Sequence, residues 1–114
     1  MKTVLQHLED YFDESNECQL TPRIVCNDGF NISVQGGNRF NYCDPRERIK
    51  LFWLVELGFP SEPIPELKEY KDGKEHEDME TVFGYVPIEK VEALIQRHGG
   101  INEAKSIGKK EGVK

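Results

Sequence analysis

The segment NDG at residues 27–29 separates two short runs of strand-forming residues and predicts a reversal of the chain between them. The runs are RIVC before the segment and FNISVQ after it. Asp and Gly both tolerate the positive φ angles of a tight turn, so the pair predicts an antiparallel hairpin. Because FNISVQ alternates apolar and polar residues, its strand is expected to bury one face only.

Three later segments also have the composition of strands: RFNYC at residues 39–43, KLFWLVELGF at residues 50–59 and TVFGYV at residues 81–86. RFNYC ends before Asp44-Pro45, where the proline interrupts strand pairing. KLFWLVELGF is the most apolar part of the chain and is predicted to be a central strand covered on both faces. The segment PELKEYKDG that follows it predicts a short helix before a turn.

Two amphipathic helices flank these strands. Thr3 and Gln6 match a capping box, in which a hydroxyl and an amide satisfy backbone N–H groups at the start of a helix. The segment PIEKVEALIQRHGG at residues 87–100 predicts the second helix, which Gly99 ends in a left-handed conformation. In the first helix, apolar residues at helical spacing form a predicted buried stripe. They are Val4, Leu5, Leu8, Tyr11 and Phe12.

Together these elements predict an α+β domain. Its sheet is expected to be mostly antiparallel, with about five strands and with the N-terminal and C-terminal helices packed on one face. Residues 1–101 form this single domain. Residues 102–114 contain four lysines and little apolar content, so they are expected to form a flexible basic tail.

The apolar content limits where the chain can reside. No segment approaches the roughly 20 apolar residues that span a bilayer. The acidic, amphipathic start MKTVLQHLEDYF is unlike a signal peptide. Cys18, Cys26 and Cys43 are too sparse for a disulfide framework and form no CxxC pair. The expectation is a cytoplasmic protein with no membrane partner.

Charge is segregated along the chain, whose formal net charge is −6. Residues 1–17 carry five acids against one lysine, and residues 62–80 carry eight acids against three lysines. Such surfaces repel phosphate backbones, so no direct nucleic-acid ligand is expected, and a basic protein surface is favoured. Candidate binding residues in the first block are Glu9, Asp10, Asp13 and Glu14.

The segment RFNYCDPRERIK at residues 39–50 allows two interpretations. As structure, Asp44 and the following proline make a turn at a strand end, with solvated charges beyond it. As function, its cations and aromatic residues form a patch for a carboxylate or a phosphate. The candidate residues are Tyr42, Asp44, Arg46, Arg48 and Trp53.

Catalytic chemistry has little support in the sequence. Cys43 would need a histidine brought beside it by folding, and a strand cysteine more commonly acts as a small hydrophobic residue. The run EHEDME at residues 75–80 lacks the spacing of a calcium loop. Neither a Walker motif nor a GxGxxG motif is present. The expectation is a non-enzymatic protein with no metal and no cofactor. Glu56, a lone acid inside an apolar strand, is expected to face an edge or to pair with an arginine.

Three segments carry a resemblance to a known group: SVQGGNRFNYCDPR, VELGFPSE and FGYVPIEKVEALIQRHGGI. The resemblance as a whole extends over roughly residues 20–101. They resemble a group of small uncharacterised proteins of bacteriophages and mobile elements. The resemblance implies a short accessory protein in the cytoplasm of a host bacterium. It also implies action by binding and inhibiting a host component, such as a CRISPR effector or another defence protein.

The leading hypothesis is therefore a small acidic accessory protein that binds and modulates a basic host protein, possibly one that handles nucleic acid. One alternative is a small ligand-binding or hydrolytic domain with its site at Tyr42–Arg46. Another is a structural protein that self-associates through an exposed sheet edge. The chain is expected to be a monomer or a homodimer.

Overall fold

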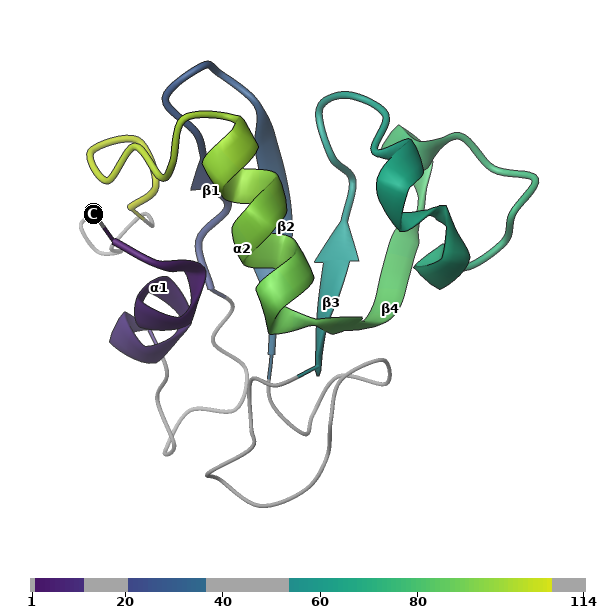
Figure 1. The fold of residues 1–114 in the computed structure, drawn as a ribbon, viewed down its shortest axis with the longest axis horizontal. Helices are drawn as coiled ribbons and strands as arrows, with labels where there is room; N and C mark the ends of the chain where they lie inside the picture. The colour runs from purple at the N-terminus through teal and green to yellow at the C-terminus, as the bar shows by residue number, and fades with distance from the viewer. Residues whose placement is uncertain (1, 12–20, 37–53, 108–114) are drawn as a thin grey trace, which may run out of the picture.

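The sheet of the computed structural model, which describes residues 2–11, 21–36 and 54–107, is antiparallel throughout (Figure 1). Its four strands lie in the order β1-β2-β3-β4. The predicted α+β class is thus confirmed, but the described residues contain four strands rather than five, and the predicted strand at residues 39–43 lies outside them. The strands are β1 (Ile24–Val25), β2 (Asn31–Gln35), β3 (Leu54–Gly58) and β4 (Val82–Pro87).

The predicted hairpin joins β1 to β2. The Cys26 N–H donates to the Phe30 carbonyl at 2.7 Å, and the Gly29 N–H donates to the Cys26 carbonyl at 3.0 Å. Gly29 adopts a φ of 100°, which a residue without Cβ reaches at no steric cost. Along β2 the apolar side chains are buried and the polar ones are half-buried, as the alternation predicts.

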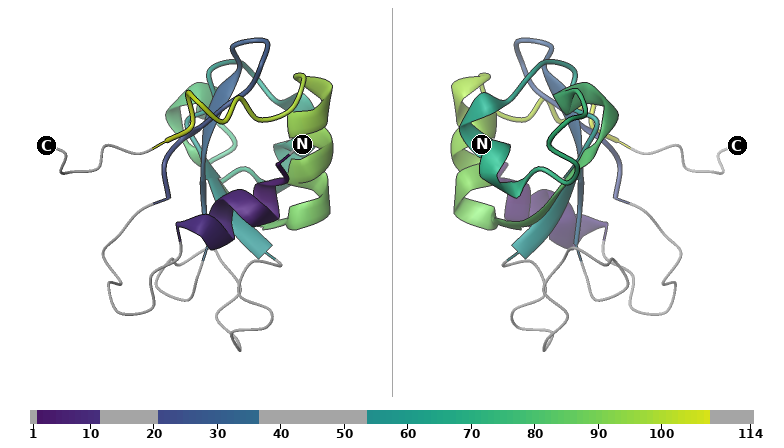
Figure 2. Two further views of the ribbon diagram at one scale, coloured as in Figure 1. Left: turned by 90° about the vertical axis from the view of Figure 1, so that its left-hand side faces the viewer. Right: turned by 90° about the vertical axis from the view of Figure 1, so that its right-hand side faces the viewer.

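Helices α1 (Val4–Asp10) and α2 (Ile88–Arg97) both lie on the same side of the sheet (Figures 1 and 2). Their apolar residues and those of the strands form one core. In β3 the side chains of Val55 and Leu57 are buried in this core, whereas Leu54 and Glu56 are only half-buried on the opposite face. The predicted burial of this strand on both faces is therefore wrong, because both helices cover the same face of the antiparallel sheet.

Helix α1 has the predicted capping box and a second cap from α2. The Gln6 N–H donates to the Thr3 hydroxyl at 3.0 Å, and the Thr3 N–H donates to the Gln6 side-chain oxygen at 2.9 Å. The Glu92 carboxylate accepts the N–H groups of Val4 and Leu5 at 3.0 and 3.2 Å. The first turn of α1 therefore obtains acceptors for its free N–H groups partly from a residue 88 positions away.

Among the described residues of the predicted apolar stripe, Leu5 does not face the core, and Phe12 lies outside the described part. Leu5 is 39 % exposed, while His7 is 1 % exposed and Leu8 is fully buried. Residues three and four positions apart share a helix face, so His7 and Leu8 lie beneath Val4 and Leu5 points outward. The His7 Nε2 compensates its burial with a hydrogen bond to the Pro22 carbonyl at 2.8 Å.

The chain after α2 lies along the outer edge of β1. Gly99 has the expected positive φ of 91°, and the buried Ile101 pairs with Cys26. The Asn102 N–H donates to the Val25 carbonyl at 2.8 Å, and the buried Ser106 hydroxyl accepts the Val25 N–H at 2.9 Å. Ordered contacts thus extend beyond the predicted domain end at residue 101, while residues 108–114 lie outside the described part.

Candidate protein-binding surface

The structure places two of the predicted binding residues and not the others. Glu9 and Asp10 are exposed on α1. The remaining candidates lie outside the described residues, so the two interpretations of residues 39–50 both stay predictions. These candidates are Asp13, Glu14, Tyr42, Asp44, Arg46, Arg48 and Trp53, together with Cys43.

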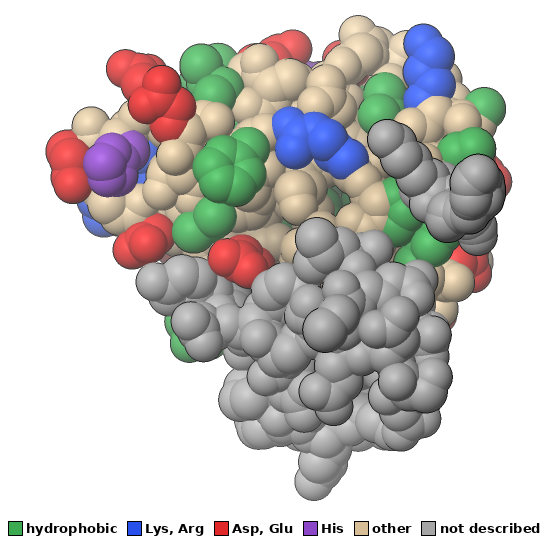
Figure 3. Space-filling model, turned by 180° about the vertical axis from the view of Figure 1, so that it is seen from behind, with side chains coloured by type: hydrophobic (Ala, Val, Ile, Leu, Met, Phe, Trp, Pro, Cys, Tyr) green, Lys and Arg blue, Asp and Glu red, His purple; other side chains and the backbone are tan. Residues whose placement is uncertain are grey.

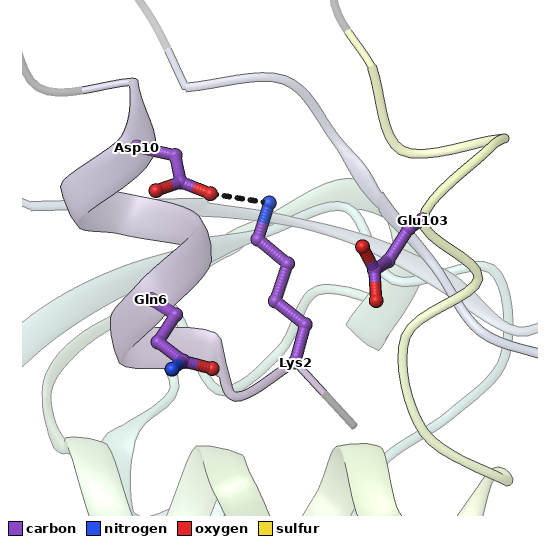
Figure 4. A pocket seen from close by; sticks show the side chains of 4 residues that line it. All are labelled: Lys2, Gln6, Asp10 and Glu103. Atoms are coloured by element: carbon purple, nitrogen blue, oxygen red, sulfur yellow. Dashed lines mark ion pairs between the residues drawn. The ribbon is translucent and has the colours of Figure 1, made fainter.

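Asp10 lines a hollow of about 330 Å³ between α1 and the segment after α2 (Figure 4). Its carboxylate pairs with the Lys2 ammonium at 2.7 Å, and that ammonium also lies 5.8 Å from the centre of the Tyr11 ring. Gln6 and Glu103 complete the lining. Because Lys2 already neutralises Asp10, α1 presents less net negative charge than its sequence suggests.

The second acidic block is the β3–β4 connection, residues 61–81, which is fixed to the domain by buried apolar side chains. It contains two 3₁₀ helices, η2 (Pro65–Tyr70) and η3 (Asp78–Glu80). Ile64 and Leu67 are 1 % and 3 % exposed and belong to the core. The short helix predicted within PELKEYKDG is therefore present at Pro65–Tyr70, in the tighter 3₁₀ form.

Asp78 is the polar anchor of the β3–β4 connection. Its carboxylate accepts the Ile64 N–H at 2.7 Å and pairs with the Lys71 ammonium at 2.8 Å. Burial alone would raise the pKa of Asp78, but the hydrogen bonds from Lys71 and Ile64 and the charge of Lys71 outweigh it and lower the pKa. Asp78 is thus held as a carboxylate that joins the start of the connection to its end.

The same connection also covers part of the outer edge of β4. Lys71 pairs with Phe83, and the Asp72 N–H donates to the Val82 carbonyl at 2.9 Å. The Thr81 hydroxyl donates to the Asp72 carbonyl at 2.7 Å. Since residues 101–106 cover the edge of β1, both outer strands of the described sheet have partners along part of their length.

Most acidic side chains of the β3–β4 connection point into solvent. Asp78 is held by Lys71, and Glu66 pairs with Arg97 of α2. Seen from behind, acidic side chains gather around a histidine at this end of the molecule (Figure 3). Four exposed carboxylates have no hydrogen-bond or ion-pair partner among the described residues. They are those of Glu62, Glu69, Glu77 and Glu80.

The two acidic blocks do not form one surface. Figure 1 shows α1 at one end of the domain and the β3–β4 connection at the other, with α2 between them. The sequence separates the blocks but does not indicate that folding keeps them apart. The β3–β4 connection, which has the larger number of unpaired carboxylates, is the stronger candidate for binding a basic surface.

The reactive side chains of the described residues do not converge. Cys26 is buried, and its burial, with the nearby charge of Asp28, raises the pKa of the thiol to about 11. Burial lowers the pKa of His7, whose ring is held by Pro22. His98 stacks on Phe30 with ring centres 4.1 Å apart. Over residues 2–11, 21–36 and 54–107, no group of His, Cys, Asp and Glu has the arrangement of a metal site.

His98 has a structural contact that also makes a testable prediction. Its Nδ1 lies 2.7 Å from the Asp28 carboxylate, which in addition accepts the Phe30 N–H at 2.9 Å. The hydrogen bond from Phe30, followed by that from His98, lowers the pKa of Asp28. A carboxyl with a lowered pKa in the folded state stabilises the fold above its ordinary pKa of about 3.9 and loses this contribution as pH falls through the lowered value.

Urea denaturation of the wild type and of Asp28→Asn across pH should therefore give midpoints whose difference is fully present above about pH 5. The difference should shrink below about pH 4, where the wild-type carboxyl also becomes neutral. A difference that stays constant down to about pH 2 would contradict this account.

Comparisons of the chain with protein-family models, with curated proteins and with solved structures found no match. Across the described residues, none of the helices has both the length and the apolar character required to cross a membrane. The geometry of the β3–β4 connection is therefore the principal guide to function.

Proposed function

We propose that the chain is a non-enzymatic binding protein that engages a basic surface of a protein partner through its β3–β4 connection. The observation that carries the proposal is the set of four unpaired, exposed carboxylates on a segment fixed by Ile64, Leu67 and Asp78. Fixed charges lose less side-chain and loop entropy on binding than charges on an unanchored loop. They also steer a complementary surface toward them.

The partner class follows from the same chemistry. Proteins that handle nucleic acid carry basic surfaces that bind a phosphate backbone, and an anchored group of carboxylates competes for such a surface. The resemblance to small phage and mobile-element proteins supports a host protein of this kind as the target. Inhibition then results from occupying the surface that the target needs for nucleic acid.

The alternatives have less support. Self-association through strand edges would need unpaired backbone groups, but residues 101–106 and 71–72 already pair with parts of the outer strands. The small-ligand alternative depends on Tyr42, Asp44 and Arg46, which lie outside the described residues, so it stays a prediction.

Two triple variants with equal charge loss test the proposal. Glu69, Glu77 and Glu80 are changed to Gln in the first, and Glu9, Glu89 and Glu103 in the second. All six side chains are exposed. Partners are captured from bacterial lysate with the full chain, identified by mass spectrometry and titrated as purified proteins over a range of salt concentrations.

The first variant should bind at least about tenfold more weakly, with a shallower salt dependence, because each rim carboxylate contributes up to about 1 kcal/mol. The second should lose less than about threefold. Equal losses in both variants would mean that overall charge, rather than the β3–β4 connection, determines binding. Recovery of acidic partners only would reject the proposal.

A further inference from the structure

The face of the sheet opposite the helices contains a half-buried carboxylate, Glu56, in the middle of a row across three strands. Gln35 of β2 lies directly opposite Glu56 in the β2–β3 register. On the other side, the β3–β4 register shifts between Val55 and Leu57, so Glu56 faces the two residues Gly84 and Tyr85. Neighbouring strands are about 4.8 Å apart, which brings Gln35, Glu56 and Tyr85 within side-chain reach of one another.

Glu56 has no hydrogen-bond or ion-pair partner in the described part of the chain. The neighbouring Gln35 amide does not supply one, because its nitrogen donates to the Thr21 carbonyl and to the Ser33 hydroxyl, both at 3.0 Å. Its oxygen accepts the Thr21 N–H at 2.9 Å. Partial burial without a compensating donor raises the pKa of Glu56. A carboxylate in this position gains from any cation that is brought to it.

Tyr85 places an aromatic ring beside that carboxylate. It lies in the bulge opposite Glu56, has a φ of 56° and is 48 % exposed. A left-handed conformation is unfavourable for a residue with a bulky side chain, and bulges redirect side chains next to binding sites. Phe83 and Val86 on either side are buried on the helix face, so the bulge is what lets Tyr85 turn away from the core.

At the opposite end of the same face, the cationic side chain of Arg23 already has hydrogen-bond acceptors. The Arg23 guanidinium donates to the Asn31 side-chain oxygen at 2.6 Å and also to the Phe59 carbonyl. Asn31 lies four residues from Gln35 along β2, or about 13 Å at the rise of a strand. A cation at Glu56 is therefore well separated from Arg23. Viewed from behind, acidic side chains and a hydrophobic side chain lie close together on this face (Figure 3).

We infer that the row Gln35–Glu56–Tyr85 is a recognition position for an arginine side chain of the basic partner. A guanidinium donates two parallel hydrogen bonds to a carboxylate and stacks on an aromatic ring, so it matches the half-buried carboxylate and the exposed ring of the row. Gln35, fixed by Thr21 and Ser33, positions the row without neutralising it. The inference deepens the proposed function and rests on it.

The test uses a synthetic nonapeptide of alternating Gly and Arg, and the same peptide with citrulline, which keeps the shape of arginine without its charge. Binding to the full chain is measured by calorimetry for the wild type and for Glu56→Gln, Tyr85→Leu and Phe59→Leu. Phe59 is the matched control, because it is also an exposed aromatic residue with positive φ, 49 % exposed and with a φ of 50°. Unfolding midpoints are measured for every variant.

Glu56→Gln should weaken binding of the arginine peptide by about tenfold or more, and Tyr85→Leu by about threefold to tenfold. Phe59→Leu should change it less than about twofold. The citrulline peptide should bind weakly and equally to the wild type and to Glu56→Gln. Glu56→Gln should leave the unfolding midpoint unchanged or raised, since it removes a partly desolvated charge.

Other results separate this inference from the proposed function. A lower midpoint with unchanged affinity in Glu56→Gln would show that the chain itself neutralises Glu56, which overturns the inference. Binding that is lost in the Glu69/Glu77/Glu80 variant but unaffected in Glu56→Gln and Tyr85→Leu would reject the inference and leave the proposed function standing. Failure of the wild type to bind the arginine peptide would overturn the inference, whereas failure of the wild type to capture a basic partner from lysate would overturn the proposed function.

Discussion

Leu8→Ala is expected to lower the free energy of unfolding by about 2–5 kcal/mol, which is a large share of the stability of a domain of this size. Leu8 is fully buried in the hydrophobic core that the helices form with the sheet. Its replacement removes apolar contacts and leaves a cavity that the surrounding strands cannot fill.

The matched control for this prediction is Leu5→Ala, the same change three residues earlier in the same helix. Leu5 is 39 % exposed, and alanine has the higher helix propensity, so the change should cost less than about 1 kcal/mol. Urea denaturation followed by far-ultraviolet circular dichroism measures both. Equal losses would mean that Leu5, as the apolar pattern predicts, also faces the core.

Asp78→Ala should have the second-largest effect, a loss of about 2–3 kcal/mol. The change removes a charged acceptor from the Ile64 N–H and leaves the Lys71 ammonium, whose side chain is only 12 % exposed, without its partner. Glu80→Ala is the control, since its exposed side chain has no partner among the described residues, and its effect should stay within about 0.5 kcal/mol.

The effect of Asp78→Ala should depend on pH in a defined direction. The pKa of Asp78 is lowered in the folded state, so its contribution is present above the ordinary carboxyl pKa of about 3.9. It is lost as pH falls through the lowered value, and the difference in unfolding midpoint between wild type and variant should shrink there. Midpoints at pH 7 and pH 3, with the exchange rate of the Ile64 amide hydrogen, check this. An unprotected Ile64 amide in the wild type would contradict it.

Local signals in the sequence predicted local structure well. The pairing of Thr3 with Gln6 and the conformations of Gly29 and Gly99 depend on residues within a few positions of each other. The alternation in β2 predicted which side chains are buried for the same reason. Such features need no knowledge of the rest of the fold.

Features that depend on distant contacts could not be predicted in this way. The apolar pattern selected Leu5 for the core, but the helix is oriented by Val4 and Leu8, and His7 is buried because Pro22 offers it a carbonyl. Asp78 counts in the sequence as one more acid in a charged loop, whereas in the fold it receives the Ile64 N–H from 14 positions away. Gln35, Glu56 and Tyr85 are likewise far apart in the sequence, and only the strand register aligns them across the face of the sheet opposite the helices.

The cap that α2 provides for α1 affects how the protein is made. A helix of seven residues is too short to persist alone in water. Glu92, which accepts its first N–H groups, is synthesised 88 residues after Val4. On a ribosome that adds about 5–20 residues each second, the N-terminal segment therefore waits several seconds for its partner. During that interval chaperones and proteases have access to it, and helix α1 becomes one of the last parts of the domain to fold.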